Sequence, residues 1–309
     1  MRRFIGSSLV LFLIAVAWAY AEYTFFTPKG SFAVEVSLEN SPYLRLPIHR
    51  NAITSLEVVG DYAIGGTSAD AGLSPFLFAV SLSRRQLELV LDLARIIPDQ
   101  RAIRSGFGRA PGGVLYAGTM PDHVGSDGHL IQVQIKGKAI ETIDLGVPVA
   151  GEGVFALASD NRLPLLYGIS YPSGKFFAFD PKDHRARVFE QTAPTKRTLA
   201  FLHGYALQPE NFLSRRLAVD RKGRVFGSMP VSRLFRFDPA AQKVEVLPDP
   251  IPEVWGRRPL GQVDVWASSP DGLLYGGNAG DGQLFRLDPD SGKVTNLGKP
   301  VMMPRLKGL

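Results

Sequence analysis

Short apolar runs separated by Gly, Pro and Asp recur along most of the chain. The clearest group is residues 271–300, DGLLYGGNAGDGQLFRLDPDSGKVTNLGKP. In this group one run ends in Tyr-Gly, a polar loop follows, a second run ends in Asp-Pro, and a third ends near Leu-Gly. No stretch keeps the 3.6-residue period of an amphipathic helix over a useful length. The pattern therefore predicts short antiparallel strands joined by tight turns.

The same order of runs recurs with a period near fifty residues. The aromatic residue of the first run falls at Tyr116, Tyr167, Phe226 and Tyr275, at spacings of 51, 59 and 49 residues. The Asp-Pro pairs that begin at residues 180, 238 and 288 recur with a similar period. Pro at the second position of a turn stops a strand. A further apolar run precedes each group. We therefore expect four-stranded units near residues 53–93, 103–148, 154–190, 217–248 and 263–300.

Four short strands in each unit of about fifty residues are typical of a β-propeller blade. One blade cannot bury both faces of its sheet, so neighbouring blades stack face to face. We expect an all-β fold in which residues 22–309 form one β-propeller domain. The repeats resemble the blades of exported bacterial β-propeller repeat proteins, which carry an LYGG…LF-x-x-DP…GKV pattern. The resemblance covers nearly all of the chain after residue 21, and it implies the architecture without an activity.

The number of blades does not follow simply from the length. Residues 305–309 look like the first strand of an incomplete unit, and residues 31–38, SFAVEVSL, also have a strand-like alternation. Either residues 31–38 complete a last blade with the C-terminus, or the chain is a truncated part of a ring of six or seven blades. We favour the second interpretation. An incomplete ring leaves sheet edges exposed, so we then expect the protein to aggregate.

The first residues have the pattern of a signal peptide. Arg2 and Arg3 are followed by an apolar stretch, and Ala19-Tyr20-Ala21 is a small-x-small cleavage site. We expect residues 1–21 to be removed and the protein to be periplasmic or secreted. The apolar stretch is shorter than the roughly 20 residues that span a bilayer. We expect no membrane span beyond the signal segment.

The chain contains no cysteine, which excludes disulfides, a thiolate nucleophile and cysteine-ligated metals. Its five histidines lack the short spacings of known ligand motifs, so we expect no metal site, and no motif indicates a cofactor. Removal of the signal peptide lowers the formal charge from +6 to +4. This mildly basic charge and the export signal argue against a nucleic-acid partner.

Arginines recur in the loops that join the last strand of one unit to the first strand of the next. In a propeller these loops share one face with the loops between the second and third strands of each blade. The candidate ligand-binding residues are Arg50, Arg104, Arg215, Arg216, Trp255, Arg257, Arg258 and Arg305. Guanidinium groups bind carboxylates and sulfates bidentately, and tryptophan stacks on sugar rings. We therefore predict binding of an anionic saccharide or a similar polyanion. The alternative is that these arginines make structural contacts between blades.

The long loop before Arg215 contains the candidate catalytic residues His203 and Tyr205. A histidine, a tyrosine and an arginine are the groups that a polysaccharide lyase needs to remove the C5 proton of a uronate and to protonate the leaving oxygen. The alternative for His203 is a packing or capping role. The sequence thus leaves open whether the protein is an enzyme of this lyase type. A third hypothesis is a protein–protein interaction module of the cell envelope.

Overall fold

The computed structural model of the protein describes residues 36–41, 43–47, 50–160, 162, 164–189, 213–229, 232–252, 262–278, 282–301 and 306. The chain divides into two units, residues 1–37 and 38–309, and all the strands belong to the second unit. Among the described residues, no helix is long and apolar enough to cross a membrane.

Five four-stranded antiparallel sheets make up this unit, together with a small hairpin of β1 (Glu39–Ser41) and β2 (Leu44–Arg45). Blade 1 contains β3 (Ile53–Val59), β4 (Tyr62–Thr67), β5 (Phe76–Ser81) and β6 (Gln86–Asp92). Blade 2 contains β7 (Gln100–Arg109), β8 (Leu115–Pro121), β9 (Leu130–Lys136) and β10 (Ala139–Gly146). Blade 3 contains β11 (Gly153–Asp160), β12 (Leu165–Tyr171), β13 (Phe176–Asp180) and β14 (Arg185–Phe189). Blade 4 contains β15 (Ala218–Val219), β16 (Val225–Met229), β17 (Arg233–Asp238) and β18 (Lys243–Val246). Blade 5 contains β19 (Val263–Ser268), β20 (Leu274–Asn278), β21 (Leu284–Leu287) and β22 (Val294–Gly298).

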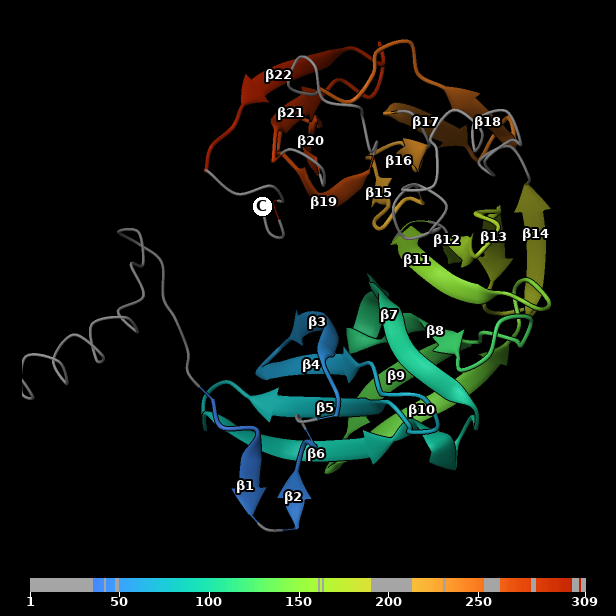
Figure 1. Ribbon diagram of the computed structural model, residues 1–309. Coiled ribbons are helices and arrows are strands. Elements are labelled where there is room, and N and C mark those ends of the chain that lie inside the picture. The colour runs from blue at the N-terminus through green and yellow to red at the C-terminus, as the bar shows by residue number, and fades with distance from the viewer. Residues whose placement is uncertain are drawn as a thin grey trace, which may run out of the picture. The chain divides into compact units, whose positions relative to one another are not determined.

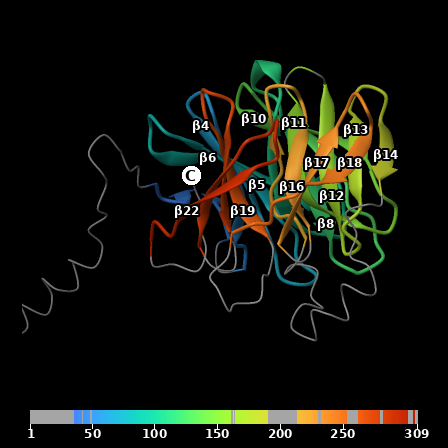
Figure 2. The ribbon, with the colours of Figure 1, turned by 90° about the horizontal axis from the view of Figure 1, so that it is seen from above.

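The strands of each blade pair in chain order, which makes every blade a simple up-and-down meander. The first strand of each blade lies innermost and the fourth lies outermost (Figure 1). Consecutive blades are in contact through their first strands, β3 with β7, β7 with β11, β11 with β15, and β15 with β19. In side view the connecting loops lie at two opposite edges of the sheets (Figure 2). This arrangement confirms the predicted all-β fold of four-stranded propeller blades.

A glycine facing a phenylalanine explains the repeated Tyr-Gly and Leu-Phe motifs. In blade 3, Gly168 pairs with Phe177 on the neighbouring strand, and a Cβ added to Gly168 would lie 2.2 Å from Phe177 Cζ. The phenylalanine ring therefore lies flat over the glycine, where no other residue would fit. The same pairing occurs at Gly65–Phe78, Gly227–Phe235 and Gly276–Phe285. Blade 2 has Leu130 opposite Gly118 instead.

The predicted Asp-Pro turns are closed by the aspartate side chain. Asp180 Oδ1 accepts a hydrogen bond from the backbone N–H of Lys182 at 2.9 Å. Asp238 and Asp288 each bind the N–H two residues later in the same way, at 2.8 and 2.9 Å. These bonds satisfy a backbone donor where the strand ends and fix the turn to the fourth strand. The repeat therefore encodes both the packing of each sheet and its last turn.

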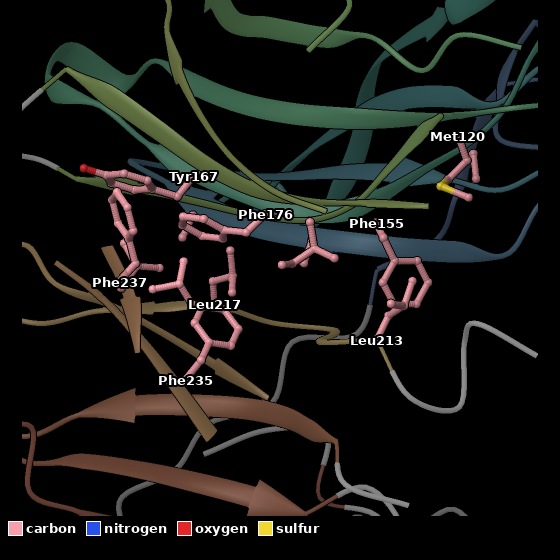
Figure 3. Close-up of a cluster of buried hydrophobic side chains, with 14 residues drawn as sticks. Met120, Phe155, Tyr167, Phe176, Leu213, Leu217, Phe235 and Phe237 are labelled. Carbon is pink, nitrogen blue, oxygen red and sulfur yellow. The ribbon is translucent and has the colours of Figure 1, made fainter. Parts of the chain in front are cut away.

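Among the described residues, four apolar clusters fill the spaces between consecutive blades. The largest joins blades 3 and 4. In it Phe176 stacks on Tyr167, meets the ring of Phe235 edge-on and lies tilted against Phe237. Figure 3 shows Met120, Phe155 and Leu213 at one end of this cluster and Tyr167 and Phe237 at the other. The remaining clusters join blades 1 and 2, blades 2 and 3, and blades 4 and 5. Stability therefore depends on burial between adjacent sheets.

Arginines near the turns between first and second strands tie adjacent blades together. Arg109 donates hydrogen bonds to Glu57 Oε1 and to the carbonyl of Val58 in blade 1. Arg162 binds the carbonyl of Arg221, and Arg221 in turn binds the carbonyl of Pro270 in blade 5. Structural contacts between blades are therefore made by arginines that are not among the predicted ligand-binding residues, at the edge opposite to the predicted binding face.

Candidate functional site

A cavity of about 570 Å³ opens at the edge where the fourth-to-first and second-to-third strand loops meet. Blades 1, 2 and 3 all contribute to it. Its walls are residues 50–52, 54, 68–70, 101, 102, 104, 120–126, 151, 153, 171 and 172. The volume lies within the range of small-molecule sites. The loops predicted to share one propeller face thus form one concave surface.

Bulges in the first strands determine which side chains reach this cavity. In β7 the pairing shifts at Arg101, and again between Ile103 and Phe107, so that residues 104–106 lie opposite Gly118 alone. In a regular strand, residues 101 and 104 would point to opposite faces because they are three positions apart. The bulges change this alternation, and both Arg101 and Arg104 line the cavity. Similar shifts occur at the start of β3, β11 and β19.

Three arginine side chains line the cavity without a partner among the described residues. Arg50, Arg101 and Arg104 make no side-chain hydrogen bond or ion pair there. Arg104 lies over the ring of Phe155, with its Cζ 5.5 Å from the ring centroid. Phe155 in turn stacks on Tyr171 at 5.8 Å, and Tyr171 forms part of the cavity wall. The cation–π contact holds the guanidinium in place without neutralising its charge.

Two carboxylates and a histidine lie in the same lining. Asp122 Oδ2 accepts a hydrogen bond from the backbone N–H of Gly72 at 2.9 Å, which links the loops of blades 1 and 2. Asp122 Oδ1 is buried without a hydrogen-bond partner. Asp70 and His123 are exposed at the cavity. The cavity thus combines three cationic groups with carboxylate acceptors and an imidazole.

The wall between blades 2 and 3 is built from closely packed backbone. The N–H of Gly151 donates to Asp127 Oδ1 at 2.7 Å, and the N–H of Gly128 donates to the carbonyl of Glu152 at 2.9 Å. A Cβ added to Gly128 would lie 2.5 Å from the carbonyl oxygen of Thr119. These contacts fix two loops against each other, so one wall of the cavity is preorganised.

Glu152, which lies between the cavity residues Gly151 and Gly153, binds protein groups in the structure. Its carboxylate accepts hydrogen bonds from Ser170 and Ser173 at 2.7 and 2.6 Å and forms an ion pair with Lys175 at 3.2 Å. Burial alone raises the pKa of this carboxyl group. The hydrogen bonds from Ser173, Ser170 and Lys175 outweigh burial, and the pKa lies below its usual value. Glu152 therefore anchors the hairpin between β12 and β13 and leaves the arginines of the cavity unpaired.

We expect Glu152→Gln to lower the free energy of unfolding by roughly 2 kcal/mol at pH 7, because charge-assisted hydrogen bonds are lost. The pKa of Glu152 is lower in the folded protein than in the unfolded chain. The charged carboxylate therefore stabilises the fold at pH values above the unfolded-state pKa. This contribution disappears as the pH falls through the folded-state pKa. The difference in the free energy of unfolding between variant and wild type should thus shrink below about pH 4.5, which urea unfolding at several pH values measures.

Glu141→Gln, which removes an exposed ion pair with Lys136, is the matched control and should have little effect on stability. A pH-independent difference would contradict this account.

The predicted site residues fall into three groups. Arg50 and Arg104 line the cavity. Arg215 is bound by blade 5, since its Nε donates to Gln262 Oε1 at 2.7 Å and lies 3.4 Å from Asp264 Oδ1. Arg216 approaches Gly106 in blade 2, away from the cavity lining. The other predicted residues lie outside the described residues, namely His203, Tyr205, Trp255, Arg257, Arg258 and Arg305.

Sequence reasoning missed Arg101, Asp122, His123 and Tyr171 as cavity residues. Arg101 lies between the predicted units of residues 53–93 and 103–148, and no sequence signal marks the bulge that turns it inward. His123 follows the second strand of blade 2 and Tyr171 is the last residue of the second strand of blade 3, so the repeat alignment could have found them. Within the described residues, no group of three or more His, Cys, Asp or Glu side chains could hold a metal ion.

Comparison with known proteins supports the fold alone. No protein-family model matches the sequence, and no curated protein matches it. The structure is similar to a catalytically inactive virginiamycin B lyase from Staphylococcus aureus, with TM-score 0.57, 10% identity, and coverage of 83% of this chain and 73% of that one. It is also similar to the Dos1 propeller, with TM-score 0.54, 13% identity and coverage of 83% and 62%. A chain of the nidogen/laminin complex matches with TM-score 0.51, 14% identity and coverage of 88% and 92%. The chain is a β-propeller repeat protein, and its structural neighbours have varied functions.

Proposed function

We propose that this protein is exported and binds an anionic saccharide, or another ligand with carboxylate or sulfate groups, in the cavity of blades 1–3. The observation that carries the proposal is that Arg50, Arg101 and Arg104 line one cavity without a partner among the described residues. A concave site lined by unpaired guanidinium groups concentrates positive potential and offers planar, bidentate donors. Both effects favour carboxylate and sulfate over neutral groups.

Several arginines outside the cavity are paired with acids of the protein. Arg109, Arg215 and Arg224 each lie within 3.5 Å of an Asp or Glu carboxylate, so their charge is offset within the protein. Glu152, which lies in the chain between the lining residues Gly151 and Gly153, is bound by Ser170, Ser173 and Lys175. Among the described residues of the cavity lining, only Asp70 and Asp122 add negative charge. The excess positive charge in the cavity is therefore available to a ligand.

The remaining lining suits a sugar. Tyr171 and Pro172 provide an apolar surface at one wall, and Asp70 and Ser126 provide hydrogen-bonding groups. Aromatic surfaces stack on the apolar faces of sugar rings, while carboxylates and amides accept or donate to hydroxyl groups. A cavity of about 570 Å³ holds a short saccharide segment, not a whole polymer chain. The proposal is therefore recognition of one or two charged sugar units.

Affinity electrophoresis tests this proposal with gels that contain polygalacturonate, alginate, heparin or the neutral polymer amylose. We expect retention by at least one anionic polymer and none by amylose. A triple variant, Arg50→Gln with Arg101→Gln and Arg104→Gln, should bind at least about 100-fold more weakly, because each lost charge-assisted hydrogen bond costs roughly 1.5–3 kcal/mol.

The matched control removes three positive charges from exposed sites outside the cavity, at Lys138, Lys182 and Arg185. It should be retained like the wild type, since general charge attraction is screened at physiological salt. Equal retention of the two triple variants would contradict a specific site. No retention of the wild type by any polyanion would overturn the proposal and favour a protein partner.

His123 supports a second candidate, a polysaccharide lyase, because it lines the same cavity as the three arginines. In that reaction an arginine would neutralise the uronate carboxylate while His123 takes the C5 proton. The C4–O bond breaks, a C4–C5 double bond forms, and the leaving oxygen takes up a proton. New ultraviolet absorbance from the unsaturated product would support this candidate if His123→Gln abolishes it while retention on the gel persists. Retention without absorbance excludes the reaction and leaves the binding function.

A further inference from the structure

A second cavity, of about 370 Å³, lies between blades 2 and 3. It is at the edge of the turns between first and second strands, and it shares no residue with the cavity of blades 1–3. Blade 2 contributes the turn between β7 and β8, and blade 3 contributes the end of β11 and the start of β12. We call this cavity the interblade pocket, defined by Pro111, Val114, Tyr116 and Gln132 of blade 2 and by Leu165 and Leu166 of blade 3.

The turn between β7 and β8 gives the interblade pocket a preformed wall. A hydrogen bond of 2.9 Å from the N–H of Ala110 to the carbonyl of Val114 closes this turn. Between these residues lies the 3-10 turn η2 (Pro111–Gly113). The carbonyl of Gly112 in this turn accepts a hydrogen bond from Gln134 Nε2 at 3.3 Å. The turn is thus closed by its own backbone and tied to β9, so Pro111 and Val114 are positioned before any ligand binds.

Blade 3 is fixed against blade 2 at the same place. Ser159 Oγ donates a hydrogen bond of 2.6 Å to the carbonyl of Arg109. A Cβ added to Gly108 would lie 3.1 Å from Ser159 Cβ, so β7 and β11 are in close contact here. Asp160 follows in β11, and its carboxylate accepts a hydrogen bond of 2.9 Å from the N–H of Arg162. The two sides of the pocket are therefore held at a fixed separation.

The tyrosine of the repeat has a different environment here than in the next blade. Tyr167, which the repeat aligns with Tyr116, is fully buried, and its ring centroid lies 5.7 Å from that of Phe237 in blade 4. Tyr116 packs against the cluster of blades 2 and 3, but it is only partly buried and lines the interblade pocket. Part of the Tyr116 side chain is therefore available to a ligand.

The arginines at the interblade pocket already have acidic partners. Arg109 donates hydrogen bonds to Glu57 Oε1 and to the carbonyl of Val58, and Arg162 forms an ion pair with Asp160 at 3.3 Å. Most of the other lining residues are apolar. Burial of an ionised group without a partner is costly, whereas an apolar ring gains free energy when it leaves water. The pocket therefore favours an uncharged ligand, in contrast to the cavity of blades 1–3.

Two polar side chains in the interblade pocket are available for hydrogen bonds. Tyr116 and Gln132 lie directly opposite each other on β8 and β9, so their side chains share one face of the sheet. Among the described residues, neither the hydroxyl of Tyr116 nor the amide of Gln132 has a hydrogen-bond partner. A phenol and an amide both donate and accept hydrogen bonds. The pocket thus offers an apolar surface beside one pair of polar groups.

We propose that the interblade pocket binds a small uncharged aromatic compound that carries a hydroxyl or amide group. The apolar walls and the Tyr116 ring contact the ring of the ligand, and Gln132 and the Tyr116 hydroxyl bind its polar group. The volume is near the lower end for small-molecule sites, which limits the ligand to one or two rings. This function is separate from the proposed anion binding, since the two cavities have no residue in common.

Saturation-transfer difference NMR with 4-hydroxybenzamide tests the proposal in solution. We expect saturable transfer to the ring protons, and no competition from the anionic 4-hydroxybenzoate at the same concentration. Gln132→Leu removes the amide and should weaken binding about tenfold, the effect of roughly one hydrogen bond. Gln86→Leu makes the same change on β6 of blade 1, outside the pocket, and should bind like the wild type. No transfer, equal competition by 4-hydroxybenzoate, or equal binding by the two variants would overturn the proposal.

Crystals of the wild-type protein soaked in 4-iodophenol provide a test that needs no variant. An anomalous iodine peak in the interblade pocket is expected, and its absence would overturn the proposal. A peak confined to the cavity of blades 1–3 would overturn it as well, because the pocket would then not be the site for this class of ligand. Neither result changes the expected retention by polyanions, so the two proposals can fail separately.

Discussion

Replacing Gly168 with alanine is expected to lower the free energy of unfolding by about 3 kcal/mol, near the upper end for overpacking a core. The new Cβ would lie 2.2, 2.6 and 2.8 Å from Cζ, Cε1 and Cε2 of Phe177. Phe177 is fully buried between blades 2 and 3, so its ring cannot move away without disturbing that cluster. Urea unfolding followed by tryptophan fluorescence and circular dichroism measures the loss.

Two further variants separate overpacking from other effects of alanine in a strand. Gly108→Ala, where the nearest atom lies 3.1 Å from the added Cβ, should cost about 1 kcal/mol or less. The double variant Gly168→Ala/Phe177→Leu should be more stable than the sum of the single effects predicts, because the smaller side chain removes the clash. Strict additivity would show that the glycine–phenylalanine contact does not limit stability.

Replacing Phe176 with alanine should cost about 4 kcal/mol, the effect expected for a buried phenylalanine. Its ring lies 4.9 to 6.1 Å from the rings of Tyr167, Phe189, Phe235 and Phe237, so the change opens a cavity between blades 3 and 4. The phenol of Tyr167 is buried there without a hydrogen-bond partner, and burial raises its pKa to about 12. The cluster thus depends on packing, and urea unfolding should show the loss directly.

Val188→Ala is the control for Phe176, since Val188 is on the outer strand β14 of the same blade and is 40% exposed. We expect a change within about 0.5 kcal/mol, as for other surface positions. If Phe176→Ala costs no more than Val188→Ala, the aromatic cluster does not hold blades 3 and 4 together.

The repeat predicted the fold because its most visible residues are those that shape each blade. Gly168 and Phe177 face each other on neighbouring strands, and Asp180 closes the following turn. These contacts are local in sequence, so their spacing survives from blade to blade and can be recognised by aligning the chain against itself. The number of strands in each blade followed from the same pattern.

The cavity could be predicted only in part, because its lining depends on contacts that are distant in sequence. Arg50 and Arg104 were predicted as binding residues from their place in the loops. Arg101 reaches the cavity through a bulge that no residue type in the sequence predicts. Arg215 looked equivalent to them, yet Asp264, almost fifty residues further along, binds it. Whether a loop arginine is available to a ligand depends on the next blade, and this information is absent from the local sequence.

The bulges in the innermost strands also bear on how such a protein could change its specificity. Adding or deleting one residue at Arg101, or within residues 104–106, exchanges the side chains that face the cavity. The pairing of β8 with β9 and of β9 with β10 keeps its register, because these strands are joined by their own turns. A single inserted or deleted codon could thus give new recognition properties while the sheet that supports them stays intact.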